Sequence, residues 1–229
     1  MALAYSSLID EVQAICGSDT VNLTDARVGR WLNQSQGDIV RRWPGLRDVD
    51  RTDKTSLQCQ TDVYEYDLAV INKTDYPVAH ILGLRYIDTS DKTYYRIMPY
   101  VGGLEQWDAD FVYIPDQDTG EPQWYVRRGD ILELYPMPGS EENDDPLWLW
   151  YSYLPPDMSD DTDTPALTGF DEALIWWAVS YARSHLAQTN PTLVTVAQVN
   201  REYAIRLAQE RISGERDVDV INSMADNGP

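Results

Sequence analysis

The segment QWYVRRGDILELY, residues 123–135, carries the clearest structural signal in the chain. Residues 123–127 and 131–135 are short runs of mostly aromatic and aliphatic side chains, which are typical of β-strands. Between these runs, Arg128-Gly129-Asp130 is a turn of the kind that joins the strands of a hairpin. Arg-Gly-Asp is also an integrin-adhesion tripeptide, but a turn explains it better in a chain without an export signal. The segment therefore predicts a β-hairpin.

Further strands are predicted on both sides of this hairpin. Alternating or aromatic-rich apolar runs occur at 63–68, 80–87, 93–98 and 147–154. Prolines 155 and 156 close the last run. About six antiparallel strands predict a small β-sandwich or a partly open barrel, in which Tyr and Trp supply apolar area while keeping a polar group.

The N-terminal part of the chain has helical periodicity instead. It predicts a short helix capped by Ser6 or Ser7 and ended by Gly17. A longer helix is predicted to begin at Thr24 and to end at Pro44, because proline and the residue before it disfavour the helical backbone.

The C-terminal part predicts two more helices. An amphipathic stripe begins at Phe170 and runs toward Leu186, and a second helix is expected over about 194–212, ended by Gly214. Its inward face is predicted to consist of Val196, Val199, Tyr203 and Leu207.

Together these patterns predict an α+β fold, in which a four-helix body (two N-terminal and two C-terminal helices) is interrupted by an inserted antiparallel β domain. The charge supports the division, because residues 51–165 contain 23 acidic and 8 basic side chains. The predicted parts are the N-terminal helices (1–50), the β domain (51–165), the C-terminal helices (166–214) and a flexible C-terminal tail (215–229).

Composition excludes several classes of protein. The 229 residues include 38 acidic and 18 basic side chains, a formal charge of −20, and no basic cluster that could grip nucleic acid through its phosphates. No apolar run is long enough to span a bilayer, and the first residues do not resemble a signal peptide. Cys16 and Cys59 follow no disulfide or metal pattern, so synthesis in a cytoplasm is expected.

The sequence does not nominate a catalytic or cofactor site. It contains no phosphate-binding glycine loop, nucleophile elbow, zinc-protease or paired-cysteine motif. His80 and His185 are isolated, and Cys16 has no histidine near it in the sequence. The acidic clusters at 141–145 and 157–163 lack EF-hand spacing, so solvated loops explain them better than Ca²⁺ sites. No cofactor or metal is therefore expected, and no enzymatic activity.

Four segments, in this order and spacing, resemble the head–tail adaptor (connector) proteins of tailed bacteriophages, including the tail tubular protein A group. One is the helix end DIVRRWP, and another is YEYDL, where the family often has Tyr-Asp-Leu-Pro and this chain has Ala69 in place of the proline. The others are the hairpin GEPQWYVRRGDILELYPMP and the passage from YSYLPP into FDEALIW. The resemblance covers about residues 40–185.

This resemblance implies a structural virion protein that forms a homo-oligomeric ring, typically of about twelve copies, at the head–tail junction. Expected partners are the portal protein, a downstream tail or nozzle protein, other copies of the chain, and genomic DNA that passes through without specific binding. Helices two to four would form most contacts within the ring. The resemblance also suggests that the tail meets the portal through Val218, Val220, Ile221 and Met224. Such a protein is made in the host bacterial cytoplasm and does not bind membranes.

One alternative remains open at this point. The aromatic β domain also suits a tail-associated carbohydrate-binding module or glycan hydrolase, in which Trp124, Trp148 and Trp150 would stack on sugar rings. In the adaptor interpretation these side chains instead fill the core of the sheet.

Overall fold

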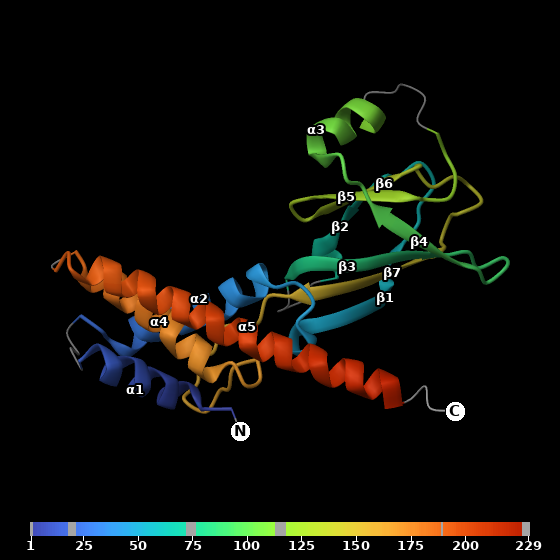
Figure 1. Ribbon diagram of the computed structural model, residues 1–229. Helices are drawn as coiled ribbons and strands as arrows, with labels where there is room; N and C mark the ends of the chain where they lie inside the picture. Colours follow the sequence, from blue (N-terminus) through green and yellow to red (C-terminus); the bar gives the residue numbers. More distant parts are fainter. Residues whose placement is uncertain (1, 18–21, 72–76, 113–117, 189, 226–229) are drawn as a thin grey trace. The chain divides into compact units, whose positions relative to one another are not determined.

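The computed structural model describes residues 2–17, 22–71, 77–112, 118–188 and 190–225, with side chains described as far as Gly214. The chain divides into two compact units (Figure 1). The helical unit comprises Met1–Val49 and Pro155–Pro229, and the sheet unit comprises Asp50–Leu154. The predicted α+β class is confirmed.

The described part of the helical unit contains four long helices: α1 (Tyr5–Cys16), α2 (Asp25–Arg42), α4 (Asp171–Leu186) and α5 (Leu193–Ala225). The predicted C-terminal end of α1 and both predicted ends of α2 are confirmed, but the predicted cap of α1 is wrong: the helix begins at Tyr5 with Ala4 as its N-cap, so Ser6 and Ser7 lie inside it. Gly17 closes α1 with a left-handed backbone at φ 96°, a conformation that costs glycine little, and Thr24 is the N-cap of α2.

The core of the helical unit joins the two parts of the chain that the sheet unit separates. Leucine, valine and alanine side chains fill most of it, among them the fully buried Leu8, Leu32 and Leu174. At its edge, the Asp38 carboxylate of α2 accepts hydrogen bonds from Trp177 Nε1 (3.2 Å) and Arg201 Nη2 (3.2 Å). The Arg201 guanidinium also lies 3.8 Å from the centroid of the Trp177 ring. These contacts tie α2 to α4 and α5.

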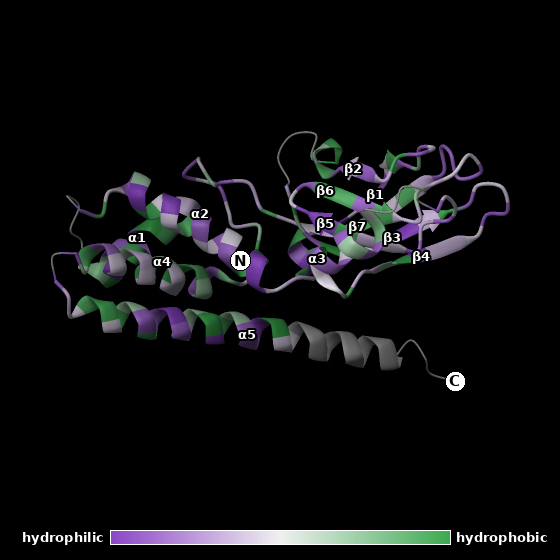
Figure 2. Cartoon of the chain, turned by 90° about the horizontal axis from the view of Figure 1, so that it is seen from above, coloured by the Kyte–Doolittle hydropathy of each residue, from purple (hydrophilic) through white to green (hydrophobic). Residues whose placement is uncertain are grey.

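The predicted inward face of α5 is wrong for its two valines, while Tyr203 and Leu207 are half-buried. Val196 and Val199 are 38% and 58% exposed, whereas Ala197, Ala204 and Ala208 are buried. Helices α4 and α5 pack closely against each other, and small side chains allow this close approach better than branched ones do. In Figure 2, hydrophobic and hydrophilic residues alternate along the described part of α5.

Helix α5 is also longer than predicted. It continues through Gly214, where the sequence predicted its end, as far as Ala225. A single glycine inside a helix costs only about 1 kcal/mol relative to alanine, so it is a weak stop when the flanking residues favour a helix. The flexibility predicted for residues 215–229 stays a prediction.

In the described part of the sheet unit, seven strands form one curled, open sheet, a half-barrel. Their order across the sheet is β1-β7-β3-β4-β5-β6-β2. The strands are β1 (Asp50–Gln58), β2 (Glu65–Asp67), β3 (Val78–Ile87), β4 (Tyr94–Pro99), β5 (Trp124–Arg128), β6 (Ile131–Tyr135) and β7 (Pro146–Tyr153). Of the two predicted architectures, this is the partly open barrel. Its described strand pairs are antiparallel, as predicted, apart from β4 and β5, which pair in parallel.

The hairpin predicted at 123–135 is confirmed as β5 and β6. Gly129 in its turn has φ 64°, so glycine fits there without strain. The Arg127 guanidinium donates hydrogen bonds to the carbonyls of Val78 (2.7 Å) and Ala79 (2.8 Å) on β3. The arginines beside the Gly-Asp turn therefore help to hold the sheet together.

Short helical segments complete the fold, and the sequence did not predict them. Helix α3 (Gly103–Trp107) continues into a π-helical turn, Asp108–Val112, and 3₁₀ turns occupy Arg47–Val49 and Leu68–Val70. Trp107 at the end of α3 is 1% exposed, and its indole nitrogen donates to Glu133 Oε2 at 2.7 Å.

We expect Trp177→Ala to lower the free energy of unfolding of the helical unit by about 3–5 kcal/mol, because it removes a buried aromatic side chain and its contacts with Asp38 and Arg201. Urea denaturation followed by far-ultraviolet circular dichroism measures this loss. Val194→Ala, at a side chain that is 48% exposed on the same unit, is the control and should change stability by less than about 0.5 kcal/mol. A loss for Trp177→Ala no larger than that of the control would contradict the assignment.

Candidate interaction surfaces

The acidic loop of residues 157–163 is shaped by one of its own carboxylates. Asp163 accepts backbone hydrogen bonds from Ser159 (2.7 Å) and Asp160 (2.9 Å), and these bonds lower the pKa of Asp163. The side chains of Asp157, Asp160 and Asp161 remain exposed. Within the described residues, no three Asp, Glu, His or Cys side chains are arranged to hold a metal ion.

The second acidic cluster, residues 141–145, is partly a buried hydrogen-bonding centre. Asp145 is 2% exposed and accepts hydrogen bonds from the Tyr86 hydroxyl (2.7 Å) and from the Thr89 backbone (3.1 Å). Burial raises the pKa of Tyr86, and the hydrogen bond to Asp145 raises it further. Glu142 accepts from the backbone of Gly139 at 2.8 Å. These two carboxylates build the loop that leads into β7.

The isolated histidines and cysteines lie in structural positions. His80 is on β3, and His185 of α4 lies beside the Trp31 ring and 3.0 Å from Nη1 of Arg27. Cys59 is fully buried, which raises the pKa of its thiol to about 12, an effect that the nearby carboxylates strengthen. Burial also raises the pKa of Cys16. A thiol with a raised pKa is a poor nucleophile at neutral pH.

An apolar stripe runs along α5, with two exposed valines followed by a half-buried tyrosine. We call Val196, Val199 and Tyr203, which recur at intervals of three and four residues, the α5 stripe. The Tyr203 ring packs edge-on against Trp176 with centroids 5.4 Å apart, and its hydroxyl contacts Glu172. Val199, Glu202, Tyr203 and Arg206 line a shallow hollow of about 450 Å³ beside the stripe. Exposed branched side chains next to a hollow suit contact with another protein surface.

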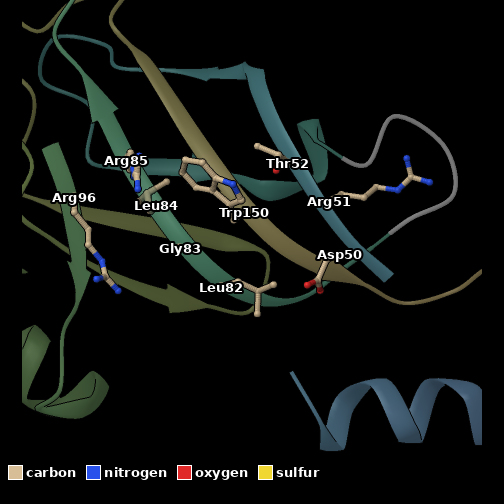
Figure 3. A pocket seen from close by; sticks show the side chains of 9 residues that line it. All are labelled: Asp50, Arg51, Thr52, Leu82, Gly83, Leu84, Arg85, Arg96 and Trp150. Carbon is tan, nitrogen blue, oxygen red and sulfur yellow. The ribbon is translucent and has the colours of Figure 1, made fainter. Parts of the chain in front are cut away.

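A second hollow, of about 490 Å³, lies on the sheet unit (Figure 3). We call it the arginine hollow; it is lined by Asp50, Arg51, Thr52, Leu82, Gly83, Leu84, Arg85, Arg96 and Trp150. Gly83 leaves space here, because a Cβ added to it would have only an ordinary contact, 3.8 Å, with Trp150. In Figure 3, Arg85 lies beside the Trp150 ring and Arg96 projects from the neighbouring strand, whereas Arg51 extends away from them.

The tryptophans of this face do not form a flat platform for a sugar. The rings of Trp148 and Trp150 are inclined at 61° to each other. Lys54 Nζ lies 4.1 Å from the Trp148 centroid, and Arg85 Cζ lies 5.0 Å from that of Trp150. Trp124, 37% exposed, stands edge-on to Tyr100. Cations over the rings and tilted planes therefore give the carbohydrate alternative no support.

The tail residues predicted to meet the portal, Val218, Val220, Ile221 and Met224, fall on the last turns of α5. Their side chains lie outside the described residues. The sequence pattern placed the residues of the α5 stripe on one face but predicted that face to be inward, and it missed the arginine hollow. The alternation on β3 and β7 did contain a signal for the hollow, because Arg85 and Trp150 fall at positions that point out of the core.

We expect Asp145→Ala to lower the free energy of unfolding of the sheet unit by about 2–3 kcal/mol, because it leaves the buried Tyr86 hydroxyl without its acceptor. Urea denaturation followed by tryptophan fluorescence reports on this unit. Glu141→Ala removes an exposed carboxylate of the same cluster and should cost less than about 0.5 kcal/mol. Equal losses for the two variants would show that Asp145 is not the structural carboxylate of the cluster.

Comparison with known proteins identifies the family. The sequence matches the family described as SU10 adaptor protein over residues 3–225, which is nearly the whole chain, so the protein belongs to this family. No curated protein matches the sequence. Among the described residues, no helix is both long and apolar enough to cross a membrane.

Proposed function

We propose that this member of the SU10 adaptor protein family forms a homo-oligomeric ring of about twelve copies between the portal and the tail, and that genomic DNA passes through its centre. The family match over residues 3–225 carries this proposal. A phage adaptor of this family is a structural component of the virion at the head–tail junction, where it interacts with portal and tail components. The subunit number, the surfaces used and the path of the DNA are the proposed details.

The α5 stripe supports self-association. Val196 and Val199 project from the exposed side of α5, where Gln198 lies on the other flank of the helix from Val196. The buried alanine face of α5 already serves the contact with α4, so the valines are left for another surface. Burying apolar area of this kind stabilises an interface by roughly 25 cal/mol per Å² before the cost of association.

The charge of the chain supports a DNA conduit rather than a DNA-binding protein. A formal charge of −20 repels phosphates, and a negative lining lets a duplex slide where a basic lining would hold it.

Val199→Glu tests the use of the stripe in the ring. It places a charge on the apolar contact and should weaken self-association by at least about tenfold. Gln198→Glu adds the same charge on the other flank of α5 and should leave association unchanged. Sedimentation velocity on the free protein measures the change, and cryo-electron microscopy of portal complexes counts the copies. A Val199→Glu protein that still forms the wild-type ring would exclude the stripe, while copies in threes or sixes at the tail periphery would exclude the adaptor ring itself.

A deletion of residues 215–229 tests the predicted contact with the portal. We expect the shortened chain to keep its far-ultraviolet circular dichroism apart from the loss of the last helical turns, but to lose binding to the portal protein of its own phage. The physical reason is that the deletion removes the few apolar side chains that would be buried on the portal surface. Co-sedimentation of the two proteins measures the binding, and undiminished binding by the shortened chain would contradict the tail contact.

A further inference from the structure

The cations of the arginine hollow are arranged in an unfavourable way. Arg85 on β3 lies directly opposite Arg96 on β4, and Trp148 on β7 lies opposite Arg85 on its other side. Lys54 of β1 completes the row, above the Trp148 ring. Three cations and an aromatic ring thus lie across four neighbouring strands. Like charges directly opposite each other destabilise a sheet unless an anion lies between them.

Asp50 also lines the hollow, but no described carboxylate forms an ion pair with either of the two facing arginines. Among the described residues, neither Arg85 nor Arg96 forms an ion pair, although the same unit pairs Arg128 with both Glu133 and Asp108. Both arginines are exposed. Although the protein has 38 acidic side chains, none of the described ones pairs with these two facing arginines. A carboxylate from another molecule would stabilise them by forming charged hydrogen bonds with both.

The occupant suited to this hollow is an acidic protein segment rather than DNA. Leu82, 37% exposed, and the Trp150 ring give the hollow an apolar side that a phosphate backbone does not use. Three cations are also too few to hold a duplex against the repulsion of a protein with a charge of −20. Arginine and tryptophan together are the side chains that most often anchor protein interfaces.

The chain itself carries an acidic segment of this kind. The acidic loop of residues 157–163 exposes Asp157, Asp160 and Asp161, while Asp163 fixes its backbone. In the other acidic cluster, Glu142 and Asp145 are buried and already bonded within their own unit. In a cyclic ring, each copy contacts the next through two different surfaces. A cationic hollow on one unit and an acidic loop on the other unit are two such different surfaces.

We infer that the arginine hollow of one copy binds the acidic loop of residues 157–163 of a second copy. The inference rests on the proposed ring and adds a second contact to it. In this contact the carboxylates of Asp160 and Asp161 lie between Arg85 and Arg96, and they relieve the repulsion of the two guanidinium groups.

Charge reversal on each side tests the pairing. Arg85→Glu/Arg96→Glu should weaken self-association by at least about tenfold, and so should Asp160→Arg/Asp161→Arg. The four changes combined in one chain should restore association, because they exchange the two charges. Mixing the two double variants should restore it as well, since each then meets a complementary copy. If mixing the two double variants restores association, the contact must lie between two chains and not within one chain.

The matched control is Arg30→Glu/Lys92→Glu, which changes the net charge equally at two exposed positions outside the hollow. It should associate like the wild type. Gly83→Val is a second test that alters no charge: it fills the hollow and should weaken association, and circular dichroism confirms that the sheet is folded. Sedimentation velocity measures the association of all variants. If the free wild-type protein is monomeric, cryo-electron microscopy of portal complexes counts the copies instead.

Several results would overturn the inference. One is that Arg85→Glu/Arg96→Glu and Gly83→Val associate like the wild type; another is that the combined exchange fails to restore association. Unchanged association together with duplex-DNA binding that Arg85→Glu/Arg96→Glu abolishes would assign the hollow to nucleic acid instead. If these variants associate like the wild type, only the proposed contact is wrong and the proposed ring still stands. If the wild-type chain does not assemble even on the portal, the proposed function is wrong.

Discussion

The helical unit depends on contacts that bring the two ends of the chain together. The chain leaves this unit after Val49 and returns to it at Pro155, so local structure alone cannot close it. Polar side chains of α2 make the connection: Asn33 exchanges two 3.0 Å hydrogen bonds with the backbone of Met158, and Gln36 accepts one from Ala166. Asp38 adds the charged contact to Arg201 of α5. These matched donors and acceptors fix where the returning segment enters the unit.

The same use of carboxylates accounts for part of the unusual acidity. Asp38, Asp145 and Glu133 each accept hydrogen bonds from aromatic side chains, namely Trp177, Tyr86 and Trp107. A chain rich in Tyr and Trp but poor in Phe buries many O–H and N–H groups, and ionised carboxylates are their strongest acceptors. The excess of Tyr and Trp over Phe and the excess of acidic side chains are therefore related, because the carboxylates accept the hydrogen bonds that these aromatic side chains donate. The acids that remain exposed on the loops are those left to act on other molecules.

Most elements could be predicted from the sequence because their signals are local. The hairpin turn at Gly129, the glycine stop at Gly17 and the proline after α2 act within a few residues. Strand β1 was missed because its sequence, DRTDKTSLQ, is almost entirely polar and pairs only at the edge of the sheet. The valines of the α5 stripe were assigned to the wrong face. Periodicity identifies the apolar faces of a helix, but it does not tell which of them a neighbouring helix can approach closely. Alternation places Arg85 and Trp150 outside the core, but it does not bring them together, since that depends on the strand order that sets β1, β7, β3 and β4 side by side.

The charge of the chain limits how copies of it can associate. Each copy in the proposed ring carries a formal charge of −20, so bringing copies together raises the repulsion among them. At physiological ionic strength this repulsion is screened beyond about 8 Å, and contacts within that distance decide whether a ring forms. Two kinds of contact are then effective: apolar surface without charge, as on the α5 stripe, and local charge pairs of opposite sign, as proposed for the arginine hollow. Negative charge elsewhere on the ring would still keep the duplex from binding. The same acidic composition is therefore compatible with assembly of the ring and with passage of DNA through it.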